Sequence, residues 1–189
     1  MPASFDLLDS VTVSSNTNAI TISSIPQTHD DLYFVWVGRG YHGYDAMREL
    51  SIRINNVNNN YHFNMGFYKN GSSGSNWPGA ASYSCPLGSC VPARGTYDSY
   101  PYMMGVCELW IQEYTGSSTA RTVTGLFHSQ SVNIPGTWNN SQVGMGGIGT
   151  KDNLTYTTGG ITRVDFLNNN SSDQFRPGTK VWMYGLKKS

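Results

Sequence analysis

Two short segments place a histidine close to carboxylates, which are the residue types that general acid–base catalysis uses. His29 directly precedes Asp30 and Asp31, and His42 lies three residues before Asp45 in a stretch rich in glycine and tyrosine. The first segment lies between a proline and a long apolar run, where aspartate commonly closes a turn. His42 and Asp45 supply fewer groups than the four ligands of a typical zinc site. We interpret both segments as turns and expect no metal and no cofactor.

The three cysteines are the next candidates for chemistry, and their number is too small and too odd for a disulfide framework. Cys85 and Cys90 suit a small disulfide or half of a zinc site, but no second pair with suitable spacing follows them. Cys107 stands in an alternating pattern, which indicates a small apolar residue in a sheet. The glycine-rich segment 144–149 precedes no helical pattern and does not fit a phosphate-binding loop. Since no nucleophile with a base and no carboxylate pair is evident, the sequence predicts a protein that is not an enzyme.

Aromatic residues make up 13% of the chain, and several stand in loop-like sequence where a core has little need of them. Their large rigid faces suit stacking on a sugar or on a neighbouring subunit, and the sequence leaves both uses open. We favour subunit contact. The candidate contact residues in these segments are Trp77, Tyr83, Tyr97 and Trp138.

The elements that position these residues follow from composition and periodicity. Charged residues are 13% of the 189 residues, against about 25% in average domains, which favours strands and turns over surface helices. Apolar residues alternate with polar ones, as in half-buried strands, and Leu32 to Val37 reads as a fully buried strand. The strands expected from these patterns lie near residues 20–22, 32–37, 50–55, 61–67, 106–113, 121–128, 143–148, 161–167 and 180–186.

The predicted fold is all-β, a single-domain antiparallel β-sandwich of jelly-roll type over residues 19–189. Asparagine-rich residues 56–59 suggest a hairpin between the third and fourth strands, and strands 106–113 and 121–128 form a second hairpin. Glycine and proline interrupt the pattern at about residues 69–100, which indicates a long loop insertion. Residues 1–18 precede the first confident strand and form an N-terminal arm, in which Phe5, Leu7 and Leu8 are apolar contacts for a neighbour.

Charge and hydropathy exclude two classes of partner. The formal net charge is +0 and the isoelectric point is about 6.9, so no general field attracts nucleic acid or anionic lipid. No run approaches the roughly 20 apolar residues of a membrane span, and the first residues lack a signal-peptide pattern. We therefore expect no nucleic-acid or membrane partner and folding in the cytoplasm.

Several segments carry a resemblance to a family. They are the run from Ile20 to Val37, the strand Leu50–Asn56, the Asn60–Tyr61–His62 triplet, the strand Ile161–Leu167 and the segment from Phe175 to Ser189. Over about residues 19–186 this order resembles small β-rich virion proteins of tailed bacteriophages. The resemblance implies jelly-roll subunits that associate as homotrimers.

The expected function is that of a virion structural protein made in the host cytoplasm. The first possibility is a capsid decoration, or cement, protein whose partners are the major capsid protein and copies of itself. The alternative is a tail or head fibre that binds a host glycan. The chain shows no repetitive shaft, which favours decoration.

Overall fold

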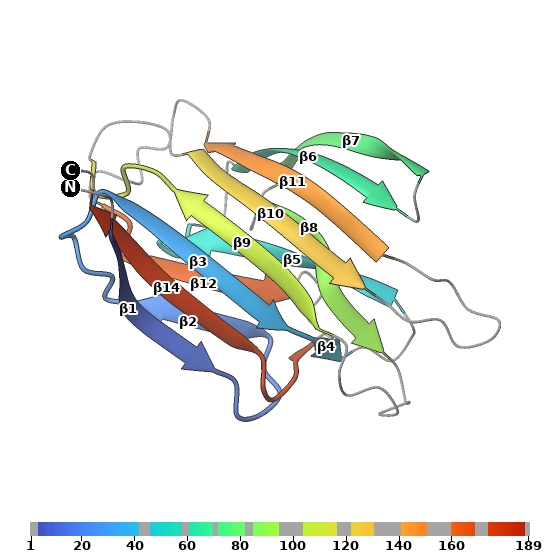
Figure 1. Cartoon of the computed structure of the whole chain (residues 1–189), viewed down its shortest axis with the longest axis horizontal. Coiled ribbons are helices and arrows are strands. Elements are labelled where there is room, and N and C mark those ends of the chain that lie inside the picture. Colours follow the sequence, from blue (N-terminus) through green and yellow to red (C-terminus); the bar gives the residue numbers. More distant parts are fainter. Residues whose placement is uncertain are drawn as a thin grey trace.

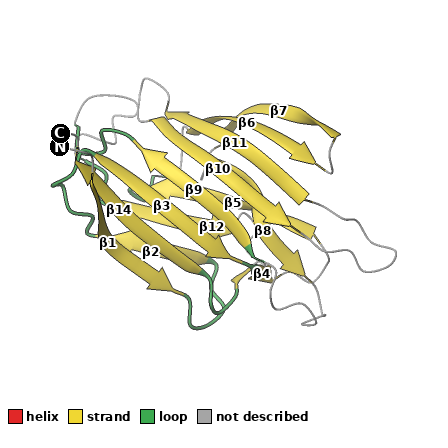
Figure 2. Ribbon diagram, viewed as in Figure 1, coloured by secondary structure: helices red, strands yellow, loops and turns green. Residues whose placement is uncertain are grey.

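The structure is a computed structural model, and every regular element that it describes is a strand (Figure 2). It describes residues 4–41, 46–57, 61–69, 72–81, 85–94, 104–116, 122–130, 141–150, 160–168 and 174–187. Side chains are described for residues 4–40, 50–57, 104–116, 160–168 and 174–187. The all-β prediction is confirmed for these residues.

The strands form two sheets that lie face to face (Figure 1). The eight-stranded sheet is antiparallel and has the spatial order β1 (Ser4–Thr12), β14 (Lys180–Lys187), β3 (Asp31–Gly38), β9 (Gly105–Ile111), β10 (Thr122–Gln130), β11 (Ser141–Thr150), β6 (Tyr61–Lys69) and β7 (Ser72–Ala81). The six-stranded sheet has the order β13 (Gln174–Phe175), β4 (Gly40–Tyr41), β8 (Cys85–Arg94), β5 (Ala46–Ile54), β12 (Arg163–Asn168) and β2 (Ala19–Ser23). Its pairs are antiparallel except β4 with β8.

The chain crosses repeatedly between the two sheets. Strands β1 and β3 belong to the eight-stranded sheet, whereas β2 and β5 belong to the six-stranded one. Late strands insert between early ones, because β14 lies between β1 and β3 and β12 lies between β5 and β2. Both halves of the sequence are therefore needed to complete either sheet.

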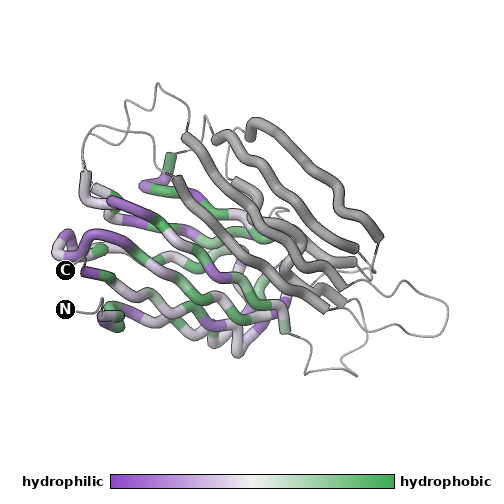
Figure 3. The backbone as a smooth tube through the Cα atoms, turned by 45° about the horizontal axis from the view of Figure 1, so that its top comes forward, coloured by the Kyte–Doolittle hydropathy of each residue, from purple (hydrophilic) through white to green (hydrophobic). Residues whose placement is uncertain are grey.

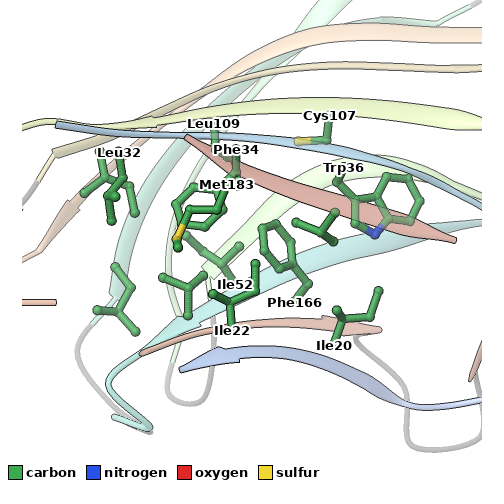
Figure 4. Packing of buried hydrophobic residues seen from close by; sticks show 14 of the residues in the cluster. Ile20, Ile22, Leu32, Phe34, Trp36, Ile52, Cys107, Leu109, Phe166 and Met183 are labelled. Carbon is green, nitrogen blue, oxygen red and sulfur yellow. The ribbon is translucent and has the colours of Figure 1, made fainter. Parts of the chain in front are cut away.

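The core side chains fill the space between the sheets (Figure 4). Along the described strands, apolar and polar residues alternate (Figure 3). Phe34 of β3 meets Phe166 of β12 edge to face, with ring centroids 5.7 Å apart. The ring of Trp36 packs on the ring of Phe175, and their centroids are 5.9 Å apart. Each such side chain contributes about 1.5–3 kcal/mol when it is fully buried. Cys107 is a free thiol in this cluster, as the sequence predicted.

One predicted hairpin is confirmed and the other is wrong. Strands β9 and β10 pair antiparallel, with Val123 opposite Ile111. Strands β5 and β6, in contrast, lie in different sheets. Asn55 and Asn56 adopt positive φ angles of 48° and 59° after β5, as expected for asparagines in a turn, but the strands on either side do not pair.

The predicted long loop at about residues 69–100 is replaced by strands β7 and β8 over much of its length. Strand β7 is an edge strand, where a proline such as Pro78 removes no ladder hydrogen bond on its open side. Cys85 and Cys90 lie in the single strand β8. Cys85 pairs with Ile52 and Val91 with Arg48, so the strand separates the two cysteines by about 10 Å, which is too far for the small disulfide considered from the sequence.

The segment predicted as an N-terminal arm supplies the edge strand of the larger sheet. Strand β1 pairs with β14 from Ser4 opposite Lys187 to Thr12 opposite Lys180. The register shifts at Leu8, which packs with Val11 against the core. Residues 4–12 are therefore docked on their own sheet instead of extending toward a neighbour.

Candidate functional site: an aromatic sheet face

Strand β3 is buried on one face only, in contrast to its prediction as a fully buried strand. Phe34 and Trp36 point into the core and are completely buried, whereas Tyr33, Val35 and Val37 are half-buried on the opposite side. The apolar run from Leu32 to Val37 therefore contributes side chains both to the core and to the outer surface of the sheet. Along β1, β14, β3 and β9, where side chains are described, the outer surface of the eight-stranded sheet is largely apolar, whereas a solvent-facing sheet would be polar there.

An aromatic cluster forms on this outer surface from four strands. Tyr33 of β3 stands opposite Tyr184 of β14 and opposite Trp110 of β9. Phe5 of β1 lies over the three rings, with centroid distances of 5.6 Å to Tyr33, 6.3 Å to Trp110 and 6.4 Å to Tyr184. These are edge-to-face contacts, which stabilise aromatic pairs by about 0.5–1.5 kcal/mol each beyond burial.

Two of the polar groups among these rings are engaged within the chain, whereas the buried indole nitrogen of Trp110 has no hydrogen-bond partner among the described residues. The hydroxyl of Tyr33 donates a hydrogen bond to Glu108 of β9. Burial, followed by this hydrogen bond and the carboxylate charge, raises the pKa of Tyr33 to about 12. The ammonium group of Lys180 lies 4.7 Å from the ring centre of Trp182, which is a cation–π contact.

We call this surface the aromatic face, and no described segment crosses in front of it (Figure 1). Phe5 and Leu7 are its most exposed large apolar residues, at 53% and 59% exposure. Its other side chains are half-buried. The described members of the aromatic face are Phe5, Leu7, Tyr33, Val35, Val37, Val106, Glu108, Trp110, Lys180, Trp182 and Tyr184.

The outer face of the six-stranded sheet has the opposite character. Asp165 of β12 is fully buried there beneath two arginines, with Arg53 Nη2 at 3.0 Å and Arg163 Nη2 at 2.8 Å from its carboxylate oxygens. Thr21 of β2 donates a further hydrogen bond of 2.6 Å. Burial alone would raise the pKa of Asp165, but the hydrogen bonds from Thr21, Arg163 and Arg53 outweigh it and lower this pKa. The network is polar, and it reaches solvent only through the side chains of Arg53 and Arg163, which are 22% and 38% exposed.

The histidine–carboxylate segment is a turn, as interpreted from the sequence. His29 is 8% exposed, and its Nε2 lies 3.0 Å from Asp6 Oδ2 of β1 while its Nδ1 lies 3.0 Å from Thr28 Oγ1. Asp31 is buried and accepts a 2.9 Å hydrogen bond from the Glu113 amide. These contacts fasten the turn to β1 and to the end of β9.

The contact residues predicted from the sequence lie in different parts of the structure, and several lie outside the described residues. Phe5 and Leu7 lie on the aromatic face, and Leu8 packs against the core. Trp77 lies in the edge strand β7, opposite Met65 in register. Tyr83, Tyr97 and Trp138, together with His42 and Asp45, lie outside the described residues.

Sequence reasoning missed Tyr33, Trp110, Trp182 and Tyr184 as surface residues. A usable signal exists, because aromatic residues occupy the half of the alternation that faces away from the core in both β9 and β14. A strand with one wet face would carry polar residues at those positions.

Comparison of the chain with protein-family models, with curated proteins and with solved structures gave no match. Within the described ranges, no three His, Cys, Asp or Glu side chains gather as a metal site. The part of the chain that the structure describes also contains no helix long and apolar enough to cross a membrane.

Proposed function

We propose that this chain is a non-enzymatic structural protein of a bacteriophage virion, and specifically a capsid decoration protein. The observation that carries the proposal is the aromatic face, a broad apolar sheet surface of the kind that marks a protein contact. The sequence resemblance to small phage virion proteins supplies the setting. The partners of the proposed protein are the major capsid protein and further copies of the chain in a homotrimer.

The strand order supports a jelly-roll type of sandwich for the proposed subunit. Two sets of four strands, β1-β14-β3-β9 and β2-β12-β5-β8, face each other, and the chain alternates between them. Jelly rolls are double sheets of eight strands built in this manner. Strands β10, β11, β6 and β7 then extend one of the sheets.

A decoration protein works by adding interfaces across the boundaries between capsid subunits. Internal genome pressure must then separate these additional contacts before the shell opens. Such a function is distributed over area and needs no reactive side chain. A wide, rigid sheet with an apolar outer surface suits it, because little conformational entropy is lost when a preorganised surface binds.

The copy number of the chain in purified virions tests the proposal. Quantitative peptide mass spectrometry would compare it with the major capsid protein of the same particles. A copy number comparable with that of the major capsid protein supports a decoration protein. A far lower number would overturn decoration in favour of a fibre, and absence from the particle would overturn the virion assignment.

A further inference from the structure

The two outer faces of the sandwich differ in a way that a monomer does not require. On the six-stranded sheet, charged groups face outward, and Asp165 is neutralised by Arg53 and Arg163. On the eight-stranded sheet, the cluster around Tyr33 leaves Phe5 and Leu7 more than half exposed. Large exposed apolar residues that gather in one patch mark a binding surface.

The chemistry of the aromatic face suits an uncharged partner. Glu108 already accepts the Tyr33 hydroxyl, and the Lys180 ammonium already lies over Trp182. A charged ligand would have to displace these contacts. The chain itself has a formal net charge of +0, so two copies do not repel each other over a long range.

Association through the adjacent sheet edge is hindered by the sequence of β1. The register of this strand shifts at Leu8, and its exposed residues include Asp6 and Asp9. The Asp9 carboxylate also accepts a hydrogen bond of 2.7 Å from the Ser10 amide. Bulges and charged residues are the devices by which edge strands avoid pairing with other chains. The face, and not the edge of β1, is therefore open to association.

The aromatic face supplies more than half of the area of a standard contact. Strands β1, β14, β3 and β9 span roughly 500 Å² of flat sheet, from a spacing of about 4.8 Å and a rise of about 3.3 Å for about eight residues each. The whole eight-stranded sheet spans roughly 1,000 Å² by the same estimate. A standard protein interface needs about 800 Å² from each partner.

We infer that the aromatic face binds a second copy of this chain, with Phe5 and Leu7 as its exposed apolar contacts along the β1 edge. The inference names a face-to-face contact that closes as a pair of copies, which is distinct from the contacts within the proposed trimer, and it rests on the proposed function for its place in a virion. Exposed apolar side chains of one copy cover those of the other, which removes both from water. The polar outer face of the six-stranded sheet stays in solvent.

Sedimentation of the full chain from low to high micromolar concentration tests this inference. We expect the wild-type chain to reach a mass of two or more copies. Leu7→Glu places a charge in the contact and is expected to weaken association by about 10-fold or more, because the carboxylate would be buried against apolar side chains. The matched control is Ser23→Glu, which changes an exposed residue of the edge strand β2 on the polar face. It is expected to associate like the wild type.

Hydroxyl-radical labelling of the wild-type chain keeps the test independent of any variant. Labelling of Phe5 and Tyr184 is expected to fall as the concentration rises. A wild-type chain that stays at the mass of one copy would overturn the inference, as would association without protection of these residues. A single-copy mass with abundant incorporation into virions would refute this contact alone, whereas self-association without incorporation would refute the virion function alone.

Discussion

Replacing Asp165 by asparagine tests the polar network that fixes β12 between β2 and β5. The carboxylate of Asp165 accepts hydrogen bonds from Thr21 Oγ1 at 2.6 Å, Arg163 Nε at 2.9 Å and Arg53 Nε at 3.0 Å. Asparagine keeps the shape of the side chain but removes its charge and turns an NH₂ group toward donors. Loss of one partner from a buried ion pair costs about 3–5 kcal/mol.

The expected loss is at the lower end of this range, about 3 kcal/mol. The side chains of Arg53 and Arg163 are 22% and 38% exposed, so water can replace part of what they lose. Urea unfolding followed by tryptophan fluorescence measures the change in the free energy of unfolding. The melting temperature should fall by about 6–12 °C, at about 2–4 °C per kcal/mol for a chain of this size. Thr21→Val, which removes one neutral donor, should cost about 1 kcal/mol.

The dependence of folding stability on pH provides a second test of the hydrogen bonds to Asp165. Because the pKa of Asp165 is lowered from its ordinary value of 3.8, the unfolded state takes up a proton before the folded state does. The wild-type chain should therefore keep this stabilisation above pH 3.8 and lose it as the pH falls further. Asp165→Asn should lack this component of the acid sensitivity. A variant within about 1 kcal/mol of the wild type, with the same acid profile, would refute the role of the network.

Three further changes probe other parts of the fold. In Gly185→Ala, the new Cβ would lie 2.5 Å from the His29 ring, so we expect a loss of about 1–3 kcal/mol in thermal unfolding, largely relieved when His29→Ala is added. Deletion of residues 1–10 removes most of β1 with its core contact at Leu8, so the melting temperature should fall; an unchanged value would show that this strand adds no stability. Raising the pH from 10 to 12 should destabilise the wild type by about 1 kcal/mol more than Tyr33→Phe, because the unfolded Tyr33 ionises before the folded one; parallel unfolding curves would contradict this.

Much of the strand content follows from local alternation. Leu50, Ile52 and Ile54 are buried, and Arg53 and Asn55 on the opposite side are half-buried, as a period of two predicts; Ser51 on that side is also buried, which the alternation does not predict. Cys107 could be assigned to the core for the same reason. Such patterns depend on neighbouring residues in the sequence, so they survive without knowledge of the partner strand.

Strand pairing and the aromatic face depend on long-range contacts that the sequence does not reveal. An asparagine-rich turn after Ile54 suits a hairpin as well as a crossing between sheets, and the rest of the fold decides between them. Phe5, Tyr33, Trp110 and Tyr184 meet only because β14 lies between β1 and β3. The sequence of an apolar run such as Leu32 to Val37 also does not show whether the second side of the strand is buried in the core or lies on an outer surface.

The energetics of desolvation assign different roles to the two outer faces. Covering the polar face with a partner would remove the partly exposed side chains of Arg53 and Arg163 further from water, at a cost of several kcal/mol for each charge that is left without new contacts. Covering the aromatic face would instead bury the exposed half of Phe5, roughly 100 Å² of apolar surface. At about 25 cal/mol per Å², this side chain alone contributes about 2.5 kcal/mol. A second copy that covers the aromatic face therefore gains free energy from the same contact that leaves the charged network in water.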